Sequence, residues 1–334
     1  MAGKNRFVTS LALSFGIASI CHGSAQAVPE FDSSPKIAQE LKLPVVEWSD
    51  PDRSQKGVIL AIHGLTLYSE TFDSLARNLA SQGYTVYASD LRGFGKWLDS
   101  DSEESKQIDF NQSKIDLLKV AKYLRDNNTN TPLFCLGESM GANLALWIAS
   151  EKAELVDGLI LSAICYKTDW HPRWRWVTDV MHALVFPKRQ LELTPYIVSN
   201  LSPDENVTNS YFSDKKIRLT IKPSKLVKAA LTNRIALKHV EKIPATMPIL
   251  IINGERDMLF KSRSVAKLVK RISSKDMEVH ILTNKGHLLL EHQQPLPVVQ
   301  RLIDSWLAGH VTKALATGHS TSSVKVAKDN SKPN

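Results

Sequence analysis

The segment Pro132–Asn143, PLFCLGESMGAN, limits the fold of this chain more than any other segment. An apolar run of strand length stops at Gly137, and an apolar run of helix length follows Gly141. The pattern G-x-S-x-G between a strand and a helix forms a strained turn, the nucleophile elbow, that exposes its serine. The glycines lack Cβ atoms, so the strand and the helix can approach closely. The pattern also suits a small-residue turn that only packs a helix on a sheet. Ser139 is therefore predicted as a nucleophile if the chain also supplies a base, an acid and oxyanion donors.

Apolar stretches of strand length alternate with helical stretches along the chain. The expected strands span residues 57–62, 84–90, 133–136, 156–165, 248–253 and 277–282. The expected helices span residues 70–82, 115–125, 140–152, 262–272 and 295–307, and residues 109–111 are an alternative start for the second of them. Strands that are apolar throughout are typical of a parallel sheet buried on both faces. The alternation indicates an α/β fold, a mostly parallel sheet with helices on both faces.

Residues 166–246 interrupt this alternation and divide the core into residues 45–165 and 247–310. The interruption holds six prolines and has helical stretches around residues 170–186 and 224–239. We interpret it as a helical cap inserted over the carboxyl edge of the sheet.

The two ends of the chain lack the core pattern. Residues 28–44 are a lead-in with one short helix near residues 36–41, and residues 45–48 form one clear strand. Residues 311–334 are rich in Ser, Thr, Lys and Ala without apolar periodicity, so we expect a disordered tail.

Residues 1–27 have the features of a cleavable secretory signal. Lys4 and Arg6 precede the apolar residues 7–20, and Ala25–Ala27 fits the small-x-small cleavage rule. The apolar run is too short to span a bilayer comfortably, which favours cleavage over an N-terminal anchor. The residues before Cys21 are a poor context for lipidation. We therefore expect an exported protein, periplasmic or secreted.

The composition indicates an ordinary globular protein, with 43% hydrophobic and 23% charged residues. Part of the net charge of +8 lies at the chain ends, so it is weak evidence for a nucleic-acid partner. Zinc-finger, RNA-binding and Walker patterns are absent from the sequence. We expect no nucleic-acid partner, no metal and no organic cofactor. Cys135 and Cys165 fall in neighbouring expected strands, a poor geometry for a disulfide, so we expect two buried thiols.

The expected acid is Asp257, which follows the buried strand at residues 248–253. Catalytic groups gather at the carboxyl edge of open α/β sheets. Glu255 is the rival acid, two positions earlier.

The expected base is His287, in the loop after the strand at residues 277–282. Its rivals are His280, within that strand, and His292, at the entry to the next helix. Ser139, Asp257 and His287 then follow one another in the chain order Ser, Asp, His. Glu291 is interpreted as a packing or salt-bridge partner of the closing helix.

The oxyanion donors are expected at two loops. One is the backbone N–H of Met140 at the start of the elbow helix, and the other is that of Leu65 in the loop after residues 57–62. Gly64 allows the turn there, and the His63 ring is expected to form hydrogen bonds within the loop.

Taken together, these motifs resemble those of the α/β-hydrolase superfamily. More narrowly, they are similar to its monoacylglycerol lipase and lysophospholipase-like branch, which has serine aminopeptidase-like members. The resemblance covers about residues 45–165 and 245–308 and rests on five motifs: His63-Gly64, Asp90–Gly95, Gly137–Gly141, Asn253–Asp257 and Asn284–His287. It implies the α/β-hydrolase fold and a Ser-His-Asp triad, without a cofactor. The five motifs indicate the fold and the triad much more specifically than they indicate the substrate.

The chain departs from the family pattern at three places. Residues 96–99, KWLD, stand where a small hydroxyl residue is common, Ala142 replaces a frequent glycine, and Asn253 stands where histidine is common. None of these changes removes a catalytic group.

The expected cap segment around residues 170–186 is rich in Trp and Arg. On a helix, Trp170 and Trp174 share one face, and we predict that they bind substrate. A face with Trp and Arg also suits contact with a membrane surface. The alternative is that this face packs the cap onto the sheet. Under either interpretation an apolar inner side favours an acyl-chain substrate.

Three functions remain open at this point. The preferred one is an exported serine ester hydrolase acting on monoacylglycerols or lysophospholipids, with small carboxyl esters or thioesters next. A serine aminopeptidase needs cap acids to hold the substrate amine, and the candidates are Glu192, Asp204, Glu205 and Asp214. A non-catalytic binding protein on the same scaffold is the third.

Overall fold

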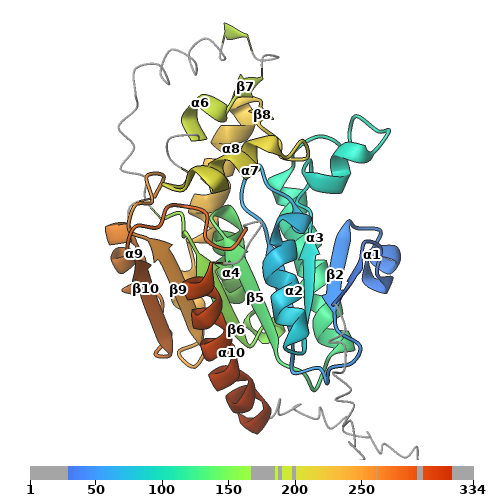
Figure 1. Ribbon diagram of the computed structural model, residues 1–334, viewed down its shortest axis with the longest axis vertical. Coiled ribbons are helices and arrows are strands. Elements are labelled where there is room, and N and C mark those ends of the chain that lie inside the picture. Colours follow the sequence, from blue (N-terminus) through green and yellow to red (C-terminus); the bar gives the residue numbers. More distant parts are fainter. Residues whose placement is uncertain are drawn as a thin grey trace, which may run out of the picture.

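The computed structural model describes residues 29–166, 185–186, 190–197, 201–260, 262–291 and 296–317. An eight-stranded sheet forms its centre, in the order β1-β2-β4-β3-β5-β6-β9-β10 (Figure 1). The strands are β1 (Glu30–Asp32), β2 (Val45–Ser49), β3 (Gly57–Ile62), β4 (Tyr84–Ser89), β5 (Leu133–Glu138), β6 (Gly158–Ser162), β9 (Ile249–Gly254) and β10 (Met277–Leu282). The pairs β1–β2 and β2–β4 are antiparallel, and all the others are parallel. The predicted mostly parallel sheet is confirmed.

Helices cover both faces of the sheet because the central strands are apolar on both sides. One face carries α1 (Lys36–Leu41), α3 (Phe110–Asn127), α4 (Met140–Glu151) and α9 (Ser262–Val269), and the other carries α2 (Asp73–Ser81) and α10 (Pro297–Thr317). Helix α8 (Pro223–Ala236) packs on α4 and α3. Short 3₁₀ turns complete the core: η1 (Ser69–Phe72), η2 (Gly95–Asp99), η3 (Ala153–Leu155) and η4 (Val240–Lys242). In β3, Leu60 faces the first group and Ile59 the second, and both are fully buried.

The strand order reverses direction at β3. From β3 the chain passes to β4 on one side of it, then returns to β5 on the other side of β3. The carboxyl ends of β3 and β5 are therefore adjacent at a topological switch point, where ligand sites form in open α/β sheets.

The described part of the cap lies above the carboxyl ends of the strands (Figure 1). It contains the hairpin β7 (Leu191–Glu192) and β8 (Thr220–Ile221), with α6 (Thr194–Ile197), α7 (Glu205–Ser213) and α8. The Arg218 N–H donates to the Thr66 carbonyl and the His287 N–H to the Leu201 carbonyl. These bonds attach the cap to loops of the core. The helix expected around residues 170–186 lies outside the described residues, apart from its last two.

Two expectations about the chain ends differ from the structure. The lead-in holds the expected helix α1 and also β1, a three-residue edge strand that pairs antiparallel with β2. The closing helix α10 runs to Thr317, so the expectation of a disordered tail from Val311 is wrong for residues 311–317. Val311 is buried with Trp306, and the His310 ring donates to the Trp306 carbonyl at 2.7 Å, so tertiary packing overrides the weak periodicity. Residues 318–334 lie outside the described residues.

Smaller differences concern element bounds. Helix α3 begins at Phe110, the earlier of the two starts considered, because the Asp109 side chain accepts the N–H groups of Asn111 and Gln112 as an N-cap. Cys135 and Cys165 are buried free thiols, as expected. None of the helices in the described ranges is long and apolar enough to cross a membrane.

Candidate active site

The elbow is a left-handed turn between β5 and α4. Ser139 has φ 57° and ψ −117°, a conformation that L-residues rarely adopt. A Cβ on Gly141 would lie 1.8 Å from the Ile62 carbonyl oxygen, and one on Gly137 would lie 2.4 Å from the Gly141 carbonyl carbon. The two glycines are thus required by the close approach of α4 to the ends of β3 and β5. The turn leaves Ser139 partly exposed at the sheet edge.

The structure brings Ser139, His287 and Asp257 together. The Ser139 Oγ lies 2.9 Å from the His287 Nε2, and the His287 Nδ1 lies 2.8 Å from an Asp257 oxygen. The Asp257 side chain is fully buried and that of His287 is 4% exposed. A carboxylate on Nδ1 fixes the proton there, so Nε2 faces the serine hydroxyl as a proton acceptor.

The acid and base loops are packed tightly on each other. A Cβ on Gly254 would lie 2.1 Å from the Gly286 carbonyl oxygen, and the Arg256 N–H donates to the Lys285 carbonyl at 2.9 Å. This contact sets the distance between the loops that follow β9 and β10, and so the distance between Asp257 and His287.

The second oxygen of Asp257 is also engaged. It accepts the N–H groups of Leu259 and Phe260, each at 2.9 Å. Because both oxygens are held, the carboxylate has one orientation toward His287.

The electrostatic setting favours a charged His287. Burial alone lowers the pKa of the imidazole, but the attraction and the hydrogen bond of Asp257, with a smaller contribution from Glu138, more than offset it. The pKa of His287 is therefore raised from its ordinary value. The imidazolium that forms when His287 takes a proton is stabilised where it stands.

Two backbone N–H groups flank Ser139 without an acceptor among the described residues. They belong to Leu65, in the loop after β3, and to Met140, the first residue of α4. The loops are close together, since a Cβ on Gly64 would lie 3.5 Å from the Ser139 Cβ. The arrangement suits an oxyanion hole that receives charge next to the serine.

His63 fixes the shape of the oxyanion loop. Its Nδ1–H donates to the Gly64 carbonyl at 2.8 Å, and its Nε2 accepts the Leu91 N–H at 3.0 Å. Burial lowers the pKa of His63, although Asp90 and the bond to Gly64 oppose this. Because Nε2 accepts an N–H, the ring is neutral; the expected hydrogen bond within the loop is confirmed by the bond to Gly64.

Two buried glutamates support the segment after His287 and the oxyanion loop, and this role was not predicted. Glu138 accepts the N–H groups of residues 289–291 and the Ser162 hydroxyl. Glu291 accepts the Gly64 N–H at 2.9 Å and pairs with the Thr71 hydroxyl, so the expectation that it partners the closing helix is wrong. Burial, and then repulsion by Glu138, raise the pKa of Glu291 well above its ordinary value.

The rival residues lie away from the triad or outside the described residues. Glu255 is exposed and accepts the Asn284 N–H at 3.3 Å. His280 lies 3.5 Å from Glu278 on β10. His292, Trp170 and Trp174 lie outside the described residues. Within the described ranges, no group of three or more His, Cys, Asp or Glu side chains could hold a metal ion.

Comparisons with known proteins identify the family of this chain. Residues 53–294 match the family model described as "Serine aminopeptidase, S33". The chain is 26% identical over 302 residues to the monoglyceride lipase of Homo sapiens, covering 89% of this chain and 96% of that protein. It is 22% identical over 268 residues to the monoacylglycerol lipase of Mycolicibacterium smegmatis, covering 78% and 91%.

Solved structures show the same fold. A soluble variant of the monoglyceride lipase of Saccharomyces cerevisiae, in complex with a substrate analogue, superposes with a TM-score of 0.67 at 18% identity. The match covers 86% of this chain and 97% of that chain. The family match over most of the core, with the sheet order and the elbow described above, places this chain in the serine aminopeptidase S33 family of the α/β-hydrolase superfamily.

Proposed function

We propose that this hydrolase cleaves acyl esters through an acyl-enzyme on Ser139. The observation that carries the proposal is the continuous hydrogen-bonded chain from Ser139 through His287 to Asp257, beside two unused N–H donors. A hydroxyl becomes nucleophilic only when a base removes its proton and a third group orients that base.

The chemistry runs in two half-reactions. His287 Nε2 takes the hydroxyl proton as Ser139 Oγ bonds to the acyl carbon, and the oxyanion accepts the N–H groups of Leu65 and Met140. The tetrahedral intermediate collapses, and His287 delivers its proton to the departing alcohol. Water then attacks the acyl-enzyme with the same base and releases the acid and free Ser139. The mechanism uses no metal or organic cofactor.

The substrate class we propose is a lipid ester, with monoacylglycerols or lysophospholipids preferred. It is supported by the relatives named above as monoglyceride and monoacylglycerol lipases. Trp170 and Trp174 remain the predicted acyl-chain contacts. Contact of the cap with a membrane surface is part of the same proposal.

Aminopeptidase activity has less support from the described cap. Glu192 pairs with Thr194, Asp204 caps α7, and Asp214 accepts the Tyr68 hydroxyl at 2.7 Å. Each of these three acids is thus engaged in a separate local contact.

The test is a substrate panel on the protein lacking residues 1–27. It comprises p-nitrophenyl esters of rising chain length, a monoacylglycerol, a lysophospholipid and an aminoacyl-naphthylamide. We expect ester hydrolysis that Ser139→Ala abolishes. The matched control is Ser150→Ala, because Ser150 lies on the same helix and its hydroxyl only bonds the Trp147 carbonyl. Hydrolysis retained by Ser139→Ala, or preference for the naphthylamide, contradicts the proposal.

Export is proposed from the signal-like residues 1–27. Expression of the full chain with N-terminal sequencing of the product tests it. A mature chain that begins at Val28 supports export, and an intact Met1 terminus in the cytoplasmic fraction overturns it.

A further inference from the structure

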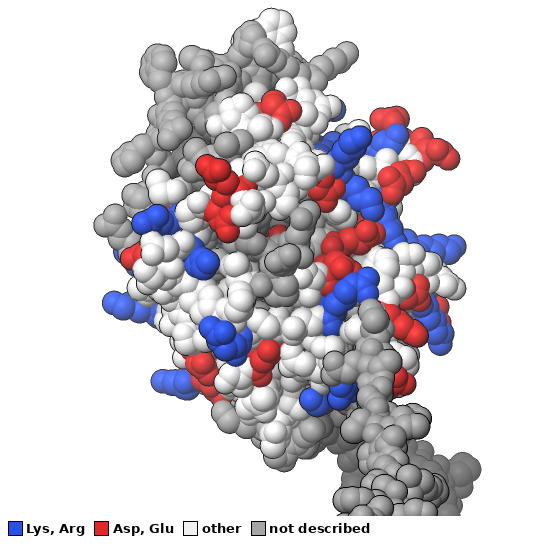
Figure 2. Space-filling model, viewed as in Figure 1, with Lys and Arg blue, Asp and Glu red and all other residues white. Residues whose placement is uncertain are grey.

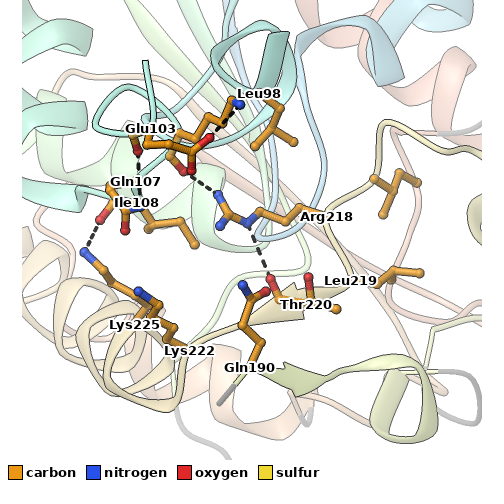
Figure 3. A pocket seen from close by; sticks show the side chains of 12 residues that line it. Leu98, Glu103, Gln107, Ile108, Gln190, Arg218, Leu219, Thr220, Lys222 and Lys225 are labelled. Atoms are coloured by element: carbon orange, nitrogen blue, oxygen red, sulfur yellow. Dashed lines mark hydrogen bonds and ion pairs between the residues drawn. The ribbon is translucent and has the colours of Figure 1, made fainter. Parts of the chain in front are cut away.

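A cavity separate from the triad lies between the cap and residues 98–108. It has a volume of about 560 Å³, and Ser139 does not line it. Its walls come from β8 and the start of α8 on one side and from residues 98–108 on the other. Figure 3 shows Arg218 reaching across the cavity from the cap toward the loop that carries Glu103 and Gln107.

Four cationic side chains line this cavity, and three of them have no acidic partner among the described residues. Lys106 forms an ion pair with Glu103 at 2.8 Å. Within the described ranges, Arg218, Lys222 and Lys225 have no carboxylate within ion-pair distance. Figure 2 shows basic side chains beside the acidic tip of the loop at the upper right.

Two of these cations, Arg218 and Lys225, are held by carbonyl groups. Arg218 Nη1 donates to the Lys106 carbonyl at 2.8 Å and to the Gly93 carbonyl, and Lys225 Nζ donates to the Ile108 carbonyl. Carbonyls orient these side chains without neutralising them. Arg218 Nη2 has no acceptor among the described residues, so part of its donor capacity remains free.

The grouping of these cations is electrostatically unfavourable without a counter-ion. Burial lowers the pKa of Arg218, and burial followed by repulsion from neighbouring lysines lowers that of Lys225. Asp109 attracts Lys225, but its side chain caps α3. The N-terminus of α8, a helix of 14 residues without a side-chain cap, adds positive potential on the same wall. A bound anion would relieve the repulsion that all these groups share.

Apolar side chains from both walls, Leu98, Ile108, Ile217 and Leu219, also line the cavity. We propose that the cavity is a binding subsite for a phosphate group, held by Arg218, Lys222 and Lys225. A phosphate monoester carries about −1.5 to −2 charges and three acceptor oxygens, which suits three cations better than a single carboxylate does. The phosphate belongs either to an amphiphile whose apolar part rests on these apolar side chains or to a small soluble ester. The proposal does not depend on ester hydrolysis, since Ser139 takes no part in it.

Calorimetric titration of the Ser139→Ala protein tests the proposal at constant ionic strength. The probes are inorganic phosphate, glycerol 3-phosphate and monomeric octyl phosphate. We expect saturable one-to-one binding that the double variant Lys222→Gln/Lys225→Gln weakens by about tenfold or more. The arginine double variant Lys222→Arg/Lys225→Arg keeps both charges and should retain binding. Lys238→Gln removes an exposed charge just beyond α8 and is the matched control, expected to bind like the parent.

The outcomes separate the sources of the phosphate. Octyl phosphate binding at least about tenfold tighter than glycerol 3-phosphate identifies an amphiphile, and comparable binding of all three identifies a soluble phosphate; both support the subsite. Absence of saturable binding to any probe overturns it. Equal weakening in Lys238→Gln also overturns it, because the effect is then one of net charge.

Discussion

Charged side chains are paired at the sheet edge that holds the triad, whereas cations in the cap-side cavity have no acidic partner among the described residues. At the edge, Asp257 lies against His287, and both of its oxygens are held. In the cavity, Arg218 and Lys225 are held only by carbonyls and remain without an acid among the described residues. The Asp257–His287 pair suits proton transfer, whereas cations without an acidic partner suit the binding of an anion. We therefore propose that the sheet edge carries the reaction and that the cap adds recognition.

The largest expected effect comes from breaking the matched pair. Asp257→Asn should lower kcat by a factor on the order of 10⁴, because the amide stabilises neither the correct tautomer nor the imidazolium. Activity in the parent should fall as the pH drops through the raised pKa of His287. In Asp257→Asn, burial lowers the pKa of His287 without the opposing effect of Asp257, so the loss of activity should occur at lower pH. Glu255→Gln, at the exposed rival acid, is the control and should stay within a few-fold of the parent; a large loss there would reassign the acid.

The next effect concerns the close approach that builds the catalytic edge. Gly141→Ala places a Cβ 1.8 Å from the Ile62 oxygen and should destabilise the fold by about 1–3 kcal/mol or more while lowering kcat. Gly309→Ala is the opposite control, because a Cβ there meets nothing within 4 Å on helix α10. It should stabilise by about 0.5–1 kcal/mol. Urea unfolding measures both, and equal stabilities would show that the elbow glycines are not required.

A smaller effect is expected at Glu291. Glu291→Ala leaves the buried Gly64 N–H without its acceptor and should cost about 1–3 kcal/mol. Glu291→Gln keeps an acceptor oxygen and should lose little activity.

The pH dependence of the free energy of unfolding distinguishes the parent from Glu291→Gln. Because the folded pKa is raised, the native state holds this proton more tightly than the unfolded state does. The free energy of unfolding of the parent should therefore fall as pH rises from about 4.3, the ordinary value for Glu, toward the folded pKa. Glu291→Gln lacks the titrating group, so its free energy of unfolding should rise relative to that of the parent as the pH rises. A constant difference between pH 5 and pH 8 would show that Glu291 is not protonated in the fold.

The parts of the site that were predicted from sequence have local signals. The elbow is contained in five residues, and Asp257 and His287 each follow a strand-length run of mostly apolar residues. Order along the chain then placed them at one sheet edge, where the structure brings them together. Their catalytic roles stay a prediction until they are measured.

The parts that were missed depend on contacts between distant residues. Glu291 reaches Gly64 across 227 positions, and nothing near Glu291 in sequence indicates that partner. Strand β1 has three residues and owes its form to pairing with β2. Helix α10 continues past Gly309 because Val311 finds a place in the core. The role of Glu291 is indicated by a cluster of buried acids near one loop. This cluster can be recognised only in the folded structure.

The most direct test of the central claim is covalent labelling by a fluorophosphonate probe with mass-spectrometric mapping of the modified peptide. The account predicts one equivalent of label on the peptide that contains Ser139, at a rate that falls on acidification as His287 becomes protonated. Ser139→Ala should remain unlabelled. Label on a different residue, or persistent labelling of Ser139→Ala, would contradict the assignment of Ser139 as the nucleophile.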